Sequence, residues 1–420
     1  MRIKLSVVVG LPRGKEFIFE AHDVFLAGRS HRCHLQADER DKAFSRVHFL
    51  IEINPPLCRL VDLGSRNGTM VNGRKVGQVD LRNGDQIQIG QTALRLTHLS
   101  DPTIGAHAPT DEPLSGVLFR APLSSSKSGI EKLPPGIPRQ VGNYRILRTL
   151  GHGIAGTTCA AVRESDNSAF SVKIIDPPMA GARPVVDKLL HDFTALQHLD
   201  DKRILRIHET GQSGRQFYAV TDFVPGVDAE KFLQQRGPLA PVMAIGLIRP
   251  ALLALEHAHS NGIVHGAIKP SNILIEEKST KGRVFVADTG VNRVYESSPL
   301  SGLTVTSNYG SAMHYLPPER LTSYRRITPA SDQYSVAATL YFLLTGKHPY
   351  EFSSPTDAFA RIINDEPTPV QQRRTDVSDE LAAIIHRGLA RETRDRFGSI
   401  ADFRLALEQW LEQGAAAATA

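Results

Sequence analysis

Residues 150–158 read LGHGIAGTT and place three glycines, Gly151, Gly153 and Gly156, between two strand-like runs. Glycine allows the backbone to approach a phosphate closely, and dinucleotide-binding folds use the same spacing to open a helix. Here a strand-like run follows instead, and Lys173 comes 22 residues after Gly151, in the run FSVKIID. A glycine-rich hairpin followed by a lysine on a strand is suited to holding nucleotide phosphates. This stretch therefore predicts a nucleotide site that opens an α+β unit.

The pattern around this stretch divides the chain into two folded units. Residues 100–140 contain seven Pro, six Ser and four Gly with hardly any apolar periodicity, which predicts a flexible linker. Before it, short alternating runs are separated by Asn-Gly turns, and after it strand patterns give way to helical ones. We expect an all-β sandwich at 1–99, a bilobal α+β unit at 141–412 with lobes at 141–224 and 225–412, and a disordered Ala-rich tail at 413–420.

Composition excludes several classes of protein. The chain has 420 residues, 22% of them charged, and a net charge of +5, values typical of globular domains and unlike those of a disordered chain. The excess of positive charge lies within residues 1–100 and is too small for a nucleic-acid-binding arm, so we expect no nucleic-acid partner. Three isolated cysteines indicate a reducing, cytoplasmic location, and no uncharged apolar run approaches the roughly 20 residues that span a bilayer.

Polar residues suited to binding phosphate gather at the predicted turns of the N-terminal unit. Arg29 offers a bidentate guanidinium, Ser45 a neutral donor, and Asn67 an amide that can both donate and accept. A sandwich brings alternate loops together at one end, so these residues can share one surface. Asn-Gly pairs alone would indicate only hairpin turns. Together the three residues predict a site for a phosphorylated ligand.

This N-terminal pattern resembles the forkhead-associated (FHA) domain. The segments GRS, SRVH, GSRNGT, VNG and LRNGDQIQIG occur in the family's order across nearly all of residues 1–100. The resemblance implies a phosphothreonine-containing protein or peptide as partner. It implies phosphate contacts by Arg29, Ser45 and Arg66, peptide-backbone contacts by Arg46 and Asn67, and a structural role for His48 behind the loops.

The C-terminal unit resembles the bacterial Ser/Thr protein kinases over about residues 143–412. The motifs are HGAIKPSNIL at 265–274, ADTG at 287–290, YLPPER at 315–320 and RDRFGS at 394–399, besides the glycine-rich stretch. The segment from ADTG to YLPPER corresponds to the family's activation segment. The resemblance implies ATP and Mg²⁺ as cofactors, with nucleotide at Gly151, Gly153, Gly156, Lys173, Asp222, Val224 and Leu274, metal at Asn272 and Asp288, and structural roles for His265, Asp332 and a Glu319–Arg396 pair.

The catalytic loop departs from the family at its chemical centre. The family has His-Arg-Asp where this chain has His265-Gly266-Ala267, so no carboxylate is available to accept the proton of a substrate hydroxyl. Lys269 remains and is expected to contact the γ-phosphate. Asp192 takes the place of the helix glutamate that pairs with the strand lysine. It is one methylene shorter, so we expect a pair with Lys173 to be weak. The segment GSAMHY also departs from the Gly-Thr-Pro segment that helps to seat the substrate.

These departures leave three interpretations open. The first is a signalling adaptor in which an FHA domain is joined to a pseudokinase that binds Mg-ATP without efficient phosphate transfer. The second is an active Ser/Thr kinase with an atypical catalytic loop, and the third is a nucleotide-free scaffold in which Asp288 pairs with Lys173. A further hypothesis is that Thr103 or Thr110 in the linker, phosphorylated by a partner Ser/Thr kinase, docks into the chain's own FHA site.

Overall fold

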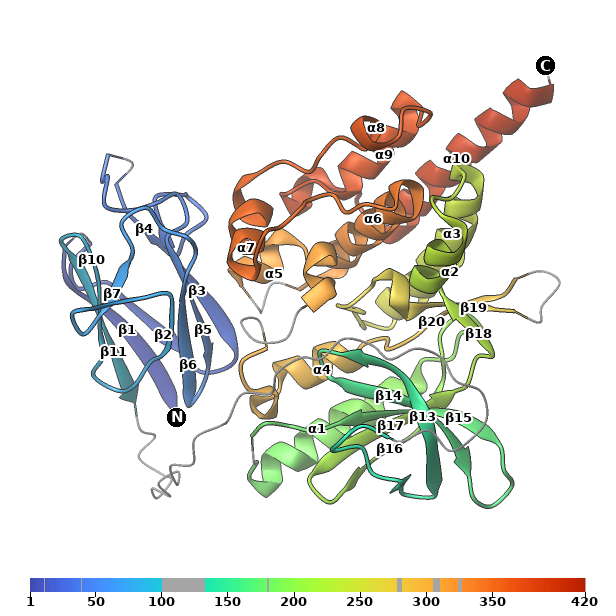
Figure 1. Ribbon diagram of the computed structural model, residues 1–420, viewed down its shortest axis with the longest axis horizontal. Coiled ribbons are helices and arrows are strands. Elements are labelled where there is room, and N and C mark those ends of the chain that lie inside the picture. Colours follow the sequence, from blue (N-terminus) through green and yellow to red (C-terminus); the bar gives the residue numbers. More distant parts are fainter. Residues whose placement is uncertain are drawn as a thin grey trace.

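The computed structural model describes the chain except residues 11, 39, 100–132, 180, 278–281, 305–309, 324–326 and 420. Figure 1 shows a β sandwich beside a larger two-lobed unit, with the lobe of strands below and the helical lobe above. The predicted fold class, an all-β FHA sandwich followed by an α+β bilobal kinase fold, is therefore confirmed. Thr103 and Thr110 lie outside the described residues.

The sandwich consists of two sheets, with strand orders β2-β1-β11-β10-β7-β8 and β4-β3-β5-β6-β9. Alternate apolar residues of both sheets, such as Leu5, Phe25, Phe49, Ile51 and Ile87, form the core between them. The strands are β1 (Arg2–Val9), β2 (Glu16–Phe19), β3 (Asp23–Gly28), β4 (Leu35–Gln36), β5 (Phe49–Asn54), β6 (Leu57–Asp62), β7 (Thr69–Val71), β8 (Arg74–Val76), β9 (Gln78–Asp80), β10 (Gln86–Ile89) and β11 (Thr92–Leu99).

The lobe of strands holds one sheet of order β12-β13-β14-β15-β17-β16 and the helix α1. Leu133 and Ile137, which the sequence analysis places in the linker, pack against this sheet. The elements are β12 (Gln140–Val141), β13 (Tyr144–Gly153), β14 (Gly156–Arg163), β15 (Ala169–Ile175), α1 (Arg183–Ala195), β16 (Ile207–Ser213) and β17 (Gln216–Asp222).

The helical lobe is built around α3 and α6, against which α9 and α10 pack. The helix α10 continues to Thr419 where a disordered tail was expected, since alanine has the highest helix propensity. The elements are β18 (Gly226–Asp228), α2 (Ala229–Arg236), α3 (Pro241–Ser260), β19 (Ile273–Glu276), β20 (Val284–Val286), α4 (Val291–Ser297), α5 (Pro318–Thr322), α6 (Pro329–Thr345), α7 (Pro355–Asn364), α8 (Val370–Arg373), α9 (Asp379–Gly388) and α10 (Ile400–Thr419).

Helix α3 is long and apolar enough to cross a membrane by length and composition alone. Its apolar residues, among them Ile245, Leu252 and Leu255, are buried in the core of the helical lobe. The helix also contacts α6 and α10, so its apolar side chains pack against other helices of the same lobe.

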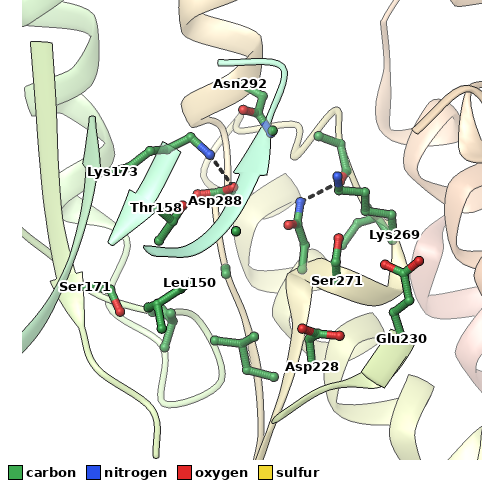
Figure 2. A pocket seen from close by; sticks show the side chains of 18 of the residues that line it. Leu150, Thr158, Ser171, Lys173, Asp228, Glu230, Lys269, Ser271, Asp288 and Asn292 are labelled. Atoms are coloured by element: carbon green, nitrogen blue, oxygen red, sulfur yellow. Dashed lines mark hydrogen bonds and ion pairs between the residues drawn. The ribbon is translucent and has the colours of Figure 1, made fainter. Parts of the chain in front are cut away.

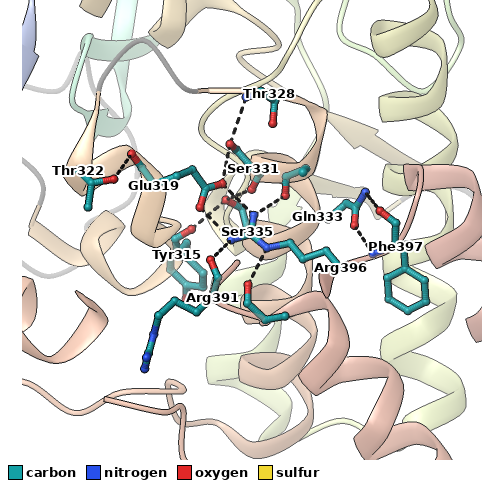
Figure 3. Close-up of polar contacts among 12 residues, drawn as sticks. Tyr315, Glu319, Thr322, Thr328, Ser331, Gln333, Ser335, Arg391, Arg396 and Phe397 are labelled. Carbon is teal, nitrogen blue, oxygen red and sulfur yellow. Dashed lines mark hydrogen bonds and ion pairs between the residues drawn. The ribbon is translucent and has the colours of Figure 1, made fainter. Parts of the chain in front are cut away.

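A buried ion pair anchors the end of the activation segment to the helical lobe (Figure 3). Arg396 donates from Nη1 and Nη2 to the two carboxylate oxygens of Glu319, each at 2.8 Å, and also to the backbone carbonyl of Ala330. The Arg396 side chain is 0% exposed and that of Glu319 11%. The predicted Glu319–Arg396 pair is therefore confirmed.

Replacing Arg396 by methionine is expected to destabilise the helical lobe by about 3–5 kcal/mol, because it leaves the Glu319 carboxylate buried without its partner. Arg394→Met is the matched control, since the Arg394 and Asp395 side chains are 84% and 61% exposed. The chain contains one tryptophan, Trp410 in α10, so its fluorescence during urea denaturation measures unfolding of this lobe. Equal midpoints for the two variants would contradict the expectation.

The sandwich packs directly on the helical lobe (Figure 1). Strand β3 contacts α5, and one apolar cluster contains residues of both units, with Leu26 and Leu50 from the sandwich and Met313, Leu321 and Phe359 from the helical lobe. The two folded units of the chain therefore share a buried interface.

Candidate functional site

Three loops of the sandwich converge on the residues predicted to bind a phosphopeptide. The backbone N–H of Arg29 donates to the Ser45 carbonyl at 3.0 Å, and Arg29 Nε donates to the Phe44 carbonyl at 2.8 Å. Ser45 Oγ accepts from the backbone N–H of Arg66 at 3.0 Å, which joins the second loop to the third. Arg29, Ser45 and Arg66 therefore lie in contacting loops, although 37 positions separate the first from the last.

The other predicted contacts, Arg46 and Asn67, are exposed on the same loops. Asn67 Nδ2 donates to the carbonyls of Lys42 and Ala43 at 2.9 and 3.1 Å, so this amide nitrogen stabilises the loop. Its Oδ1 is then the atom suited to accept a peptide N–H. The surface offers three guanidinium groups, a hydroxyl and an amide within one end of the sandwich.

His48 supports these loops from inside. It is 0% exposed, its Nδ1 accepts from the backbone N–H of Ser45 at 3.1 Å, and its Nε2 lies 3.3 Å from the Gly68 carbonyl. Burial lowers the pKa of His48. A neutral ring with its proton on Nε2 fits both contacts, which agrees with the structural role that the sequence predicts.

A cleft of about 790 Å³ lies between the two lobes of the C-terminal unit (Figure 2). Its lining brings together the glycine-rich hairpin, the strand lysine and the catalytic loop, which are far apart in the sequence. Predicted site residues that line it are Gly151, Gly153, Lys173, Val224, Ala267, Lys269, Asn272, Leu274 and Asp288.

Two predicted nucleotide residues do not line this cleft. The Asp222 carboxylate turns away and pairs with His208 at 2.6 Å. Gly156 lies at the start of β14, where its φ is +144° and an added Cβ would lie 2.1 Å from the Ile174 carbonyl. Gly156 therefore allows β14 to lie close to β15. Thr221 and Phe223, on either side of Asp222, line the cleft.

Lys173 and Asp288 form an ion pair in the cleft. Lys173 Nζ lies 2.6 Å from Asp288 Oδ2, and the Lys173 side chain is 5% exposed. Burial by itself would raise the pKa of Asp288, but the Lys173 ammonium outweighs it and holds this pKa below its usual value. Asp192 pairs with Lys188 on its own helix at 2.7 Å. The expected weakness of a Lys173–Asp192 pair is thus explained by the direction in which Asp192 points.

The catalytic loop is held by Asp332 of α6. The carboxylate of Asp332 accepts from the backbone N–H groups of His265 and Gly266 at 2.9 and 2.8 Å, and His259 lies 2.8 Å from it. His265 is 0% exposed, and its Nε2 lies 2.9 Å from the Ala287 carbonyl. These contacts agree with the structural roles that the sequence predicts for both residues. The loop keeps its shape although its catalytic aspartate is missing.

Ala267 lines the cleft with a methyl group where the family has its proton acceptor. Gly266 has φ +73°, a conformation that favours glycine, and its carbonyl accepts from the guanidinium of Arg320. Arg320, 1% exposed, also pairs with Glu296 of α4. Arg320 thus ties the catalytic loop to both ends of the activation segment, a contact that the motif comparison did not predict.

Lys269 lines the cleft and is partly buried. Burial lowers its pKa, and the carboxylates of Asp288, Glu230 and Asp228 partly oppose this shift. Figure 2 shows Glu230 and Asp228 on the same side of the cleft as Lys269. Neither carboxylate belongs to the motifs from which the site was predicted. Asp228 is also the N-cap of α2, where its side chain accepts from the backbone N–H of Lys231.

The oxygen atoms beside Asp288 fit a divalent cation. Asn272 Nδ2 donates to the Ala267 carbonyl at 2.9 Å, which leaves Oδ1 as the group able to coordinate. The buried atoms Thr289 Oγ1 and Asn292 Oδ1 have no hydrogen-bond partner among the described residues. Such atoms require water, an ion or a ligand. Asn272 and Asp288 are therefore suited to hold Mg²⁺ with a nucleotide.

Comparison with known proteins agrees with both halves of the structure. The protein kinase domain model matches residues 144–410, and the FHA domain model matches residues 25–90. The serine/threonine-protein kinase PknD of Mycobacterium tuberculosis is 30% identical over 273 residues, which are 65% of this chain and 40% of PknD. PkaA of Streptomyces coelicolor is 28% identical over 270 residues, 61% of this chain and 48% of PkaA. The chain thus spans less than half the length of these relatives.

Solved structures show the same fold. Rad53 1-466 in complex with AMP-PNP aligns with a TM-score of 0.52 at 21% identity, over 96% of this chain and 98% of that one. The PknI kinase domain of Mycobacterium tuberculosis aligns with a TM-score of 0.51 at 22% identity, over 66% of this chain and 99% of that one. From its motifs, its two-lobed fold and these matches, the chain belongs to the protein kinase family, with homologues among the bacterial Ser/Thr kinases, and carries an FHA domain before its kinase domain.

Proposed function

We propose that this signalling protein reads phosphothreonine with its FHA domain and binds Mg-ATP in a kinase domain that transfers phosphate poorly or not at all. The proposal of poor phosphate transfer rests on one observation. Ala267 lines the cleft with a methyl group, and Lys173, Asn272 and Asp288 line the same cleft. Losing a general base costs about 10²–10⁴ in rate. The chain retains the residues that would hold the nucleotide, whereas it lacks the proton acceptor.

The chain's own residues would each have a defined task in the cleft. Lys173 would hold the phosphates, exchanging part of its pair with Asp288 for them, and Asn272 and Asp288 would hold Mg²⁺. Bound ATP supplies a transferable phosphoryl group. The substrate hydroxyl would meet no carboxylate at position 267, so it would be neither oriented nor deprotonated.

One observation supports the alternative that the kinase domain is active. Lys269 lies in the cleft near Asp288, and positioning with electrostatic stabilisation supplies most of the catalysis in phosphoryl transfer. The nucleotide-free scaffold is supported by the Lys173–Asp288 pair, because the lysine then has a partner without phosphate. Measurements of nucleotide binding and of transfer separate the three functions.

Nucleotide binding is tested by the melting temperature of the full chain. ATP with Mg²⁺ at about 100 times its dissociation constant is expected to stabilise the protein by about 2.7 kcal/mol, which raises the melting temperature by roughly 5 °C. Lys173→Met is expected to abolish the shift. Lys188→Met, at a lysine whose side chain is 74% exposed, is the matched control and should keep it. If ATP with Mg²⁺ does not raise the melting temperature of the unmodified chain, the nucleotide-free scaffold is the function that remains.

The reader function is tested by calorimetry on the full chain with a phosphothreonine peptide and its unphosphorylated twin. We expect binding of the first and none of the second, because the guanidinium groups of Arg29 and Arg66 together with Ser45 would recognise the phosphate. The residues that would bind it, Arg46, Arg66 and Asn67, are exposed in the complete structure, so the site needs no rearrangement of the two domains. Equal affinity for both peptides would overturn this part of the proposal.

A further inference from the structure

Strand β5 of the sandwich is buried on both faces. Phe49, Ile51 and Ile53 point into the sandwich core. Leu50, Glu52 and Asn54 alternate with them and point the other way, yet they are 0%, 0% and 2% exposed. One face of a sandwich sheet normally meets water, so another part of the chain must cover this one.

The cover is the kinase domain's activation segment together with α7. Val24, Leu26, Leu50 and Val61 of the sandwich form one buried cluster with residues of the helical lobe. The partners are Ala312, Met313, Leu316, Leu321, Phe359, Ile362 and Ile363. We name the face formed by Val24, Leu26, Leu50, Glu52, Asn54 and Val61 the docking face.

Polar groups of the docking face are matched across the interface. His22, 3% exposed, joins the two sides: its Nε2 lies 2.9 Å from Glu52 Oε1 and its Nδ1 lies 2.8 Å from the Glu296 carbonyl. Asn54 Nδ2 donates to the Gly302 carbonyl at 2.8 Å. Buried polar groups are costly unless they are hydrogen-bonded, so a face carrying Glu52 and Asn54 fits this particular cover.

Charged groups extend the contact at its edge. Arg32 donates to the Ile363 carbonyl at 2.8 Å and to the Glu392 carboxylate at 2.6 Å. Ser323 Oγ donates to Asp23 Oδ1 at 3.3 Å. The interface therefore has an apolar centre and a hydrogen-bonded margin, as specific interfaces do.

The covered surface includes the segment that corresponds to the family's substrate seat. Ala312 and Met313 belong to the departing sequence GSAMHY, and they are 8% and 5% exposed beneath the sandwich. Arg320 of α5, which follows this segment, contacts both the Gly266 carbonyl of the catalytic loop and Glu296 of α4. A protein that approached this surface would have to displace the FHA domain.

We propose that the docking face is a built interaction surface whose partner is the chain's own activation segment and α7, and that a protein substrate or partner reaches this part of the kinase domain only after the FHA domain has moved away. The docked state leaves Arg46, Arg66 and Asn67 exposed. Phosphopeptide reading and docking thus use different surfaces of one sandwich, and either can fail without the other.

The three cysteines provide a direct measurement of docking in the full chain. Cys33 is 7% exposed and belongs to the interface cluster, Cys58 lies in the sandwich core, and Cys159 lies in the core of the strand lobe. Alkylation followed by mass spectrometry therefore distinguishes separation of the domains, which uncovers Cys33 alone, from unfolding of the sandwich, which uncovers Cys58 as well.

Leu50→Glu places a charge in the centre of the interface, and the same residue would be exposed on a separated sandwich. We expect Cys33 to be alkylated at least about tenfold faster, with Cys58 and Cys159 unchanged, and backbone amides of residues 310–323 to exchange faster with deuterium. Ile18→Glu is the matched control, because Ile18 is 52% exposed on the other sheet and should change neither rate.

Unchanged Cys33 alkylation and unchanged amide exchange in Leu50→Glu would overturn the proposal. If Cys58 is also uncovered in that variant, the sandwich has unfolded and Met313→Glu decides the question. This second variant puts the same charge on the kinase side of the cluster and leaves the sandwich sequence intact. Faster labelling of Cys33 alone then supports docking, and unchanged labelling contradicts it.

Discussion

Ala267→Asp is expected to raise the rate of phosphate transfer to a Ser/Thr substrate by about 10²–10⁴-fold, the usual contribution of a general base. The backbone that would carry the new carboxylate is already held, because Asp332 accepts from the N–H groups of His265 and Gly266 on the preceding turn. Asn272 donates to the Ala267 carbonyl, which fixes the other side of the same residue. The substitution therefore adds a proton acceptor to a loop whose shape is kept by its neighbours.

The measurement is transfer of radiolabelled phosphate by the full chain. Ala267→Asn is the matched control, since it has a similar size and cannot act as a base at neutral pH. Lys173→Met in the Ala267→Asp background should remove the gained activity, because the phosphates lose their lysine. Wild-type transfer equal to that of Ala267→Asp would contradict the proposed loss of function at this position.

The same phosphate-transfer assay also tests whether the docking face limits access of a protein substrate. If the FHA domain covers the substrate surface, the activity gained by Ala267→Asp toward a protein substrate should rise further when Leu50→Glu is added. ATP hydrolysis without a protein substrate should be the same in both backgrounds, since the cleft itself is unchanged. This comparison separates a missing base from a covered surface as the cause of low transfer.

Arg29→Ala is expected to weaken binding of a phosphothreonine peptide by about 30-fold or more. Truncating one partner of a buried or charge-assisted pair costs about 2–5 kcal/mol, and 1.4 kcal/mol corresponds to a factor of ten. Arg29 Nε is held by the Phe44 carbonyl, so the side chain is already oriented before the ligand arrives. A preorganised guanidinium loses little conformational entropy on binding, and this makes its removal costly.

Calorimetry at one fixed ionic strength gives this comparison, because salt screens charged contacts. Arg95→Ala is the matched control: it removes the same charge from an exposed position of β11, outside the three loops. Arg29→Lys should recover part of the affinity, since lysine keeps the charge but not the planar pair of donors. Equal losses in Arg29→Ala and Arg95→Ala would show a general charge effect and contradict a specific phosphate site.

Local sequence patterns identified most of the candidate site residues. The motif order predicted both domains and the Glu319–Arg396 pair, which the structure confirms, and it placed an alanine at position 267 where the family has its aspartate. The alternative partner of Lys173, Asp288, was also foreseen, since a buried lysine requires a carboxylate. These features are readable because turns, caps and catalytic loops fix residue types at short spacings.

The partners of two predicted carboxylates depended on the directions in which their side chains point. Asp222 lies on the predicted hinge but pairs with His208, and Asp192 lies on the predicted helix but pairs with Lys188. Sequence spacing gives the position of a Cα atom along an element. It does not decide which of several nearby cations a flexible carboxylate will choose.

The sequence by itself determined the two domains, their order and the absence of a proton acceptor at position 267. Only the tertiary structure decided that the FHA sandwich covers the activation segment. His22 and Glu296 are 274 positions apart and Arg32 and Ile363 are 331 apart, so no periodicity links them. A glutamate such as Glu52 on the outer face of a strand reads as solvent-exposed, and it becomes buried because folding brings a second domain over it.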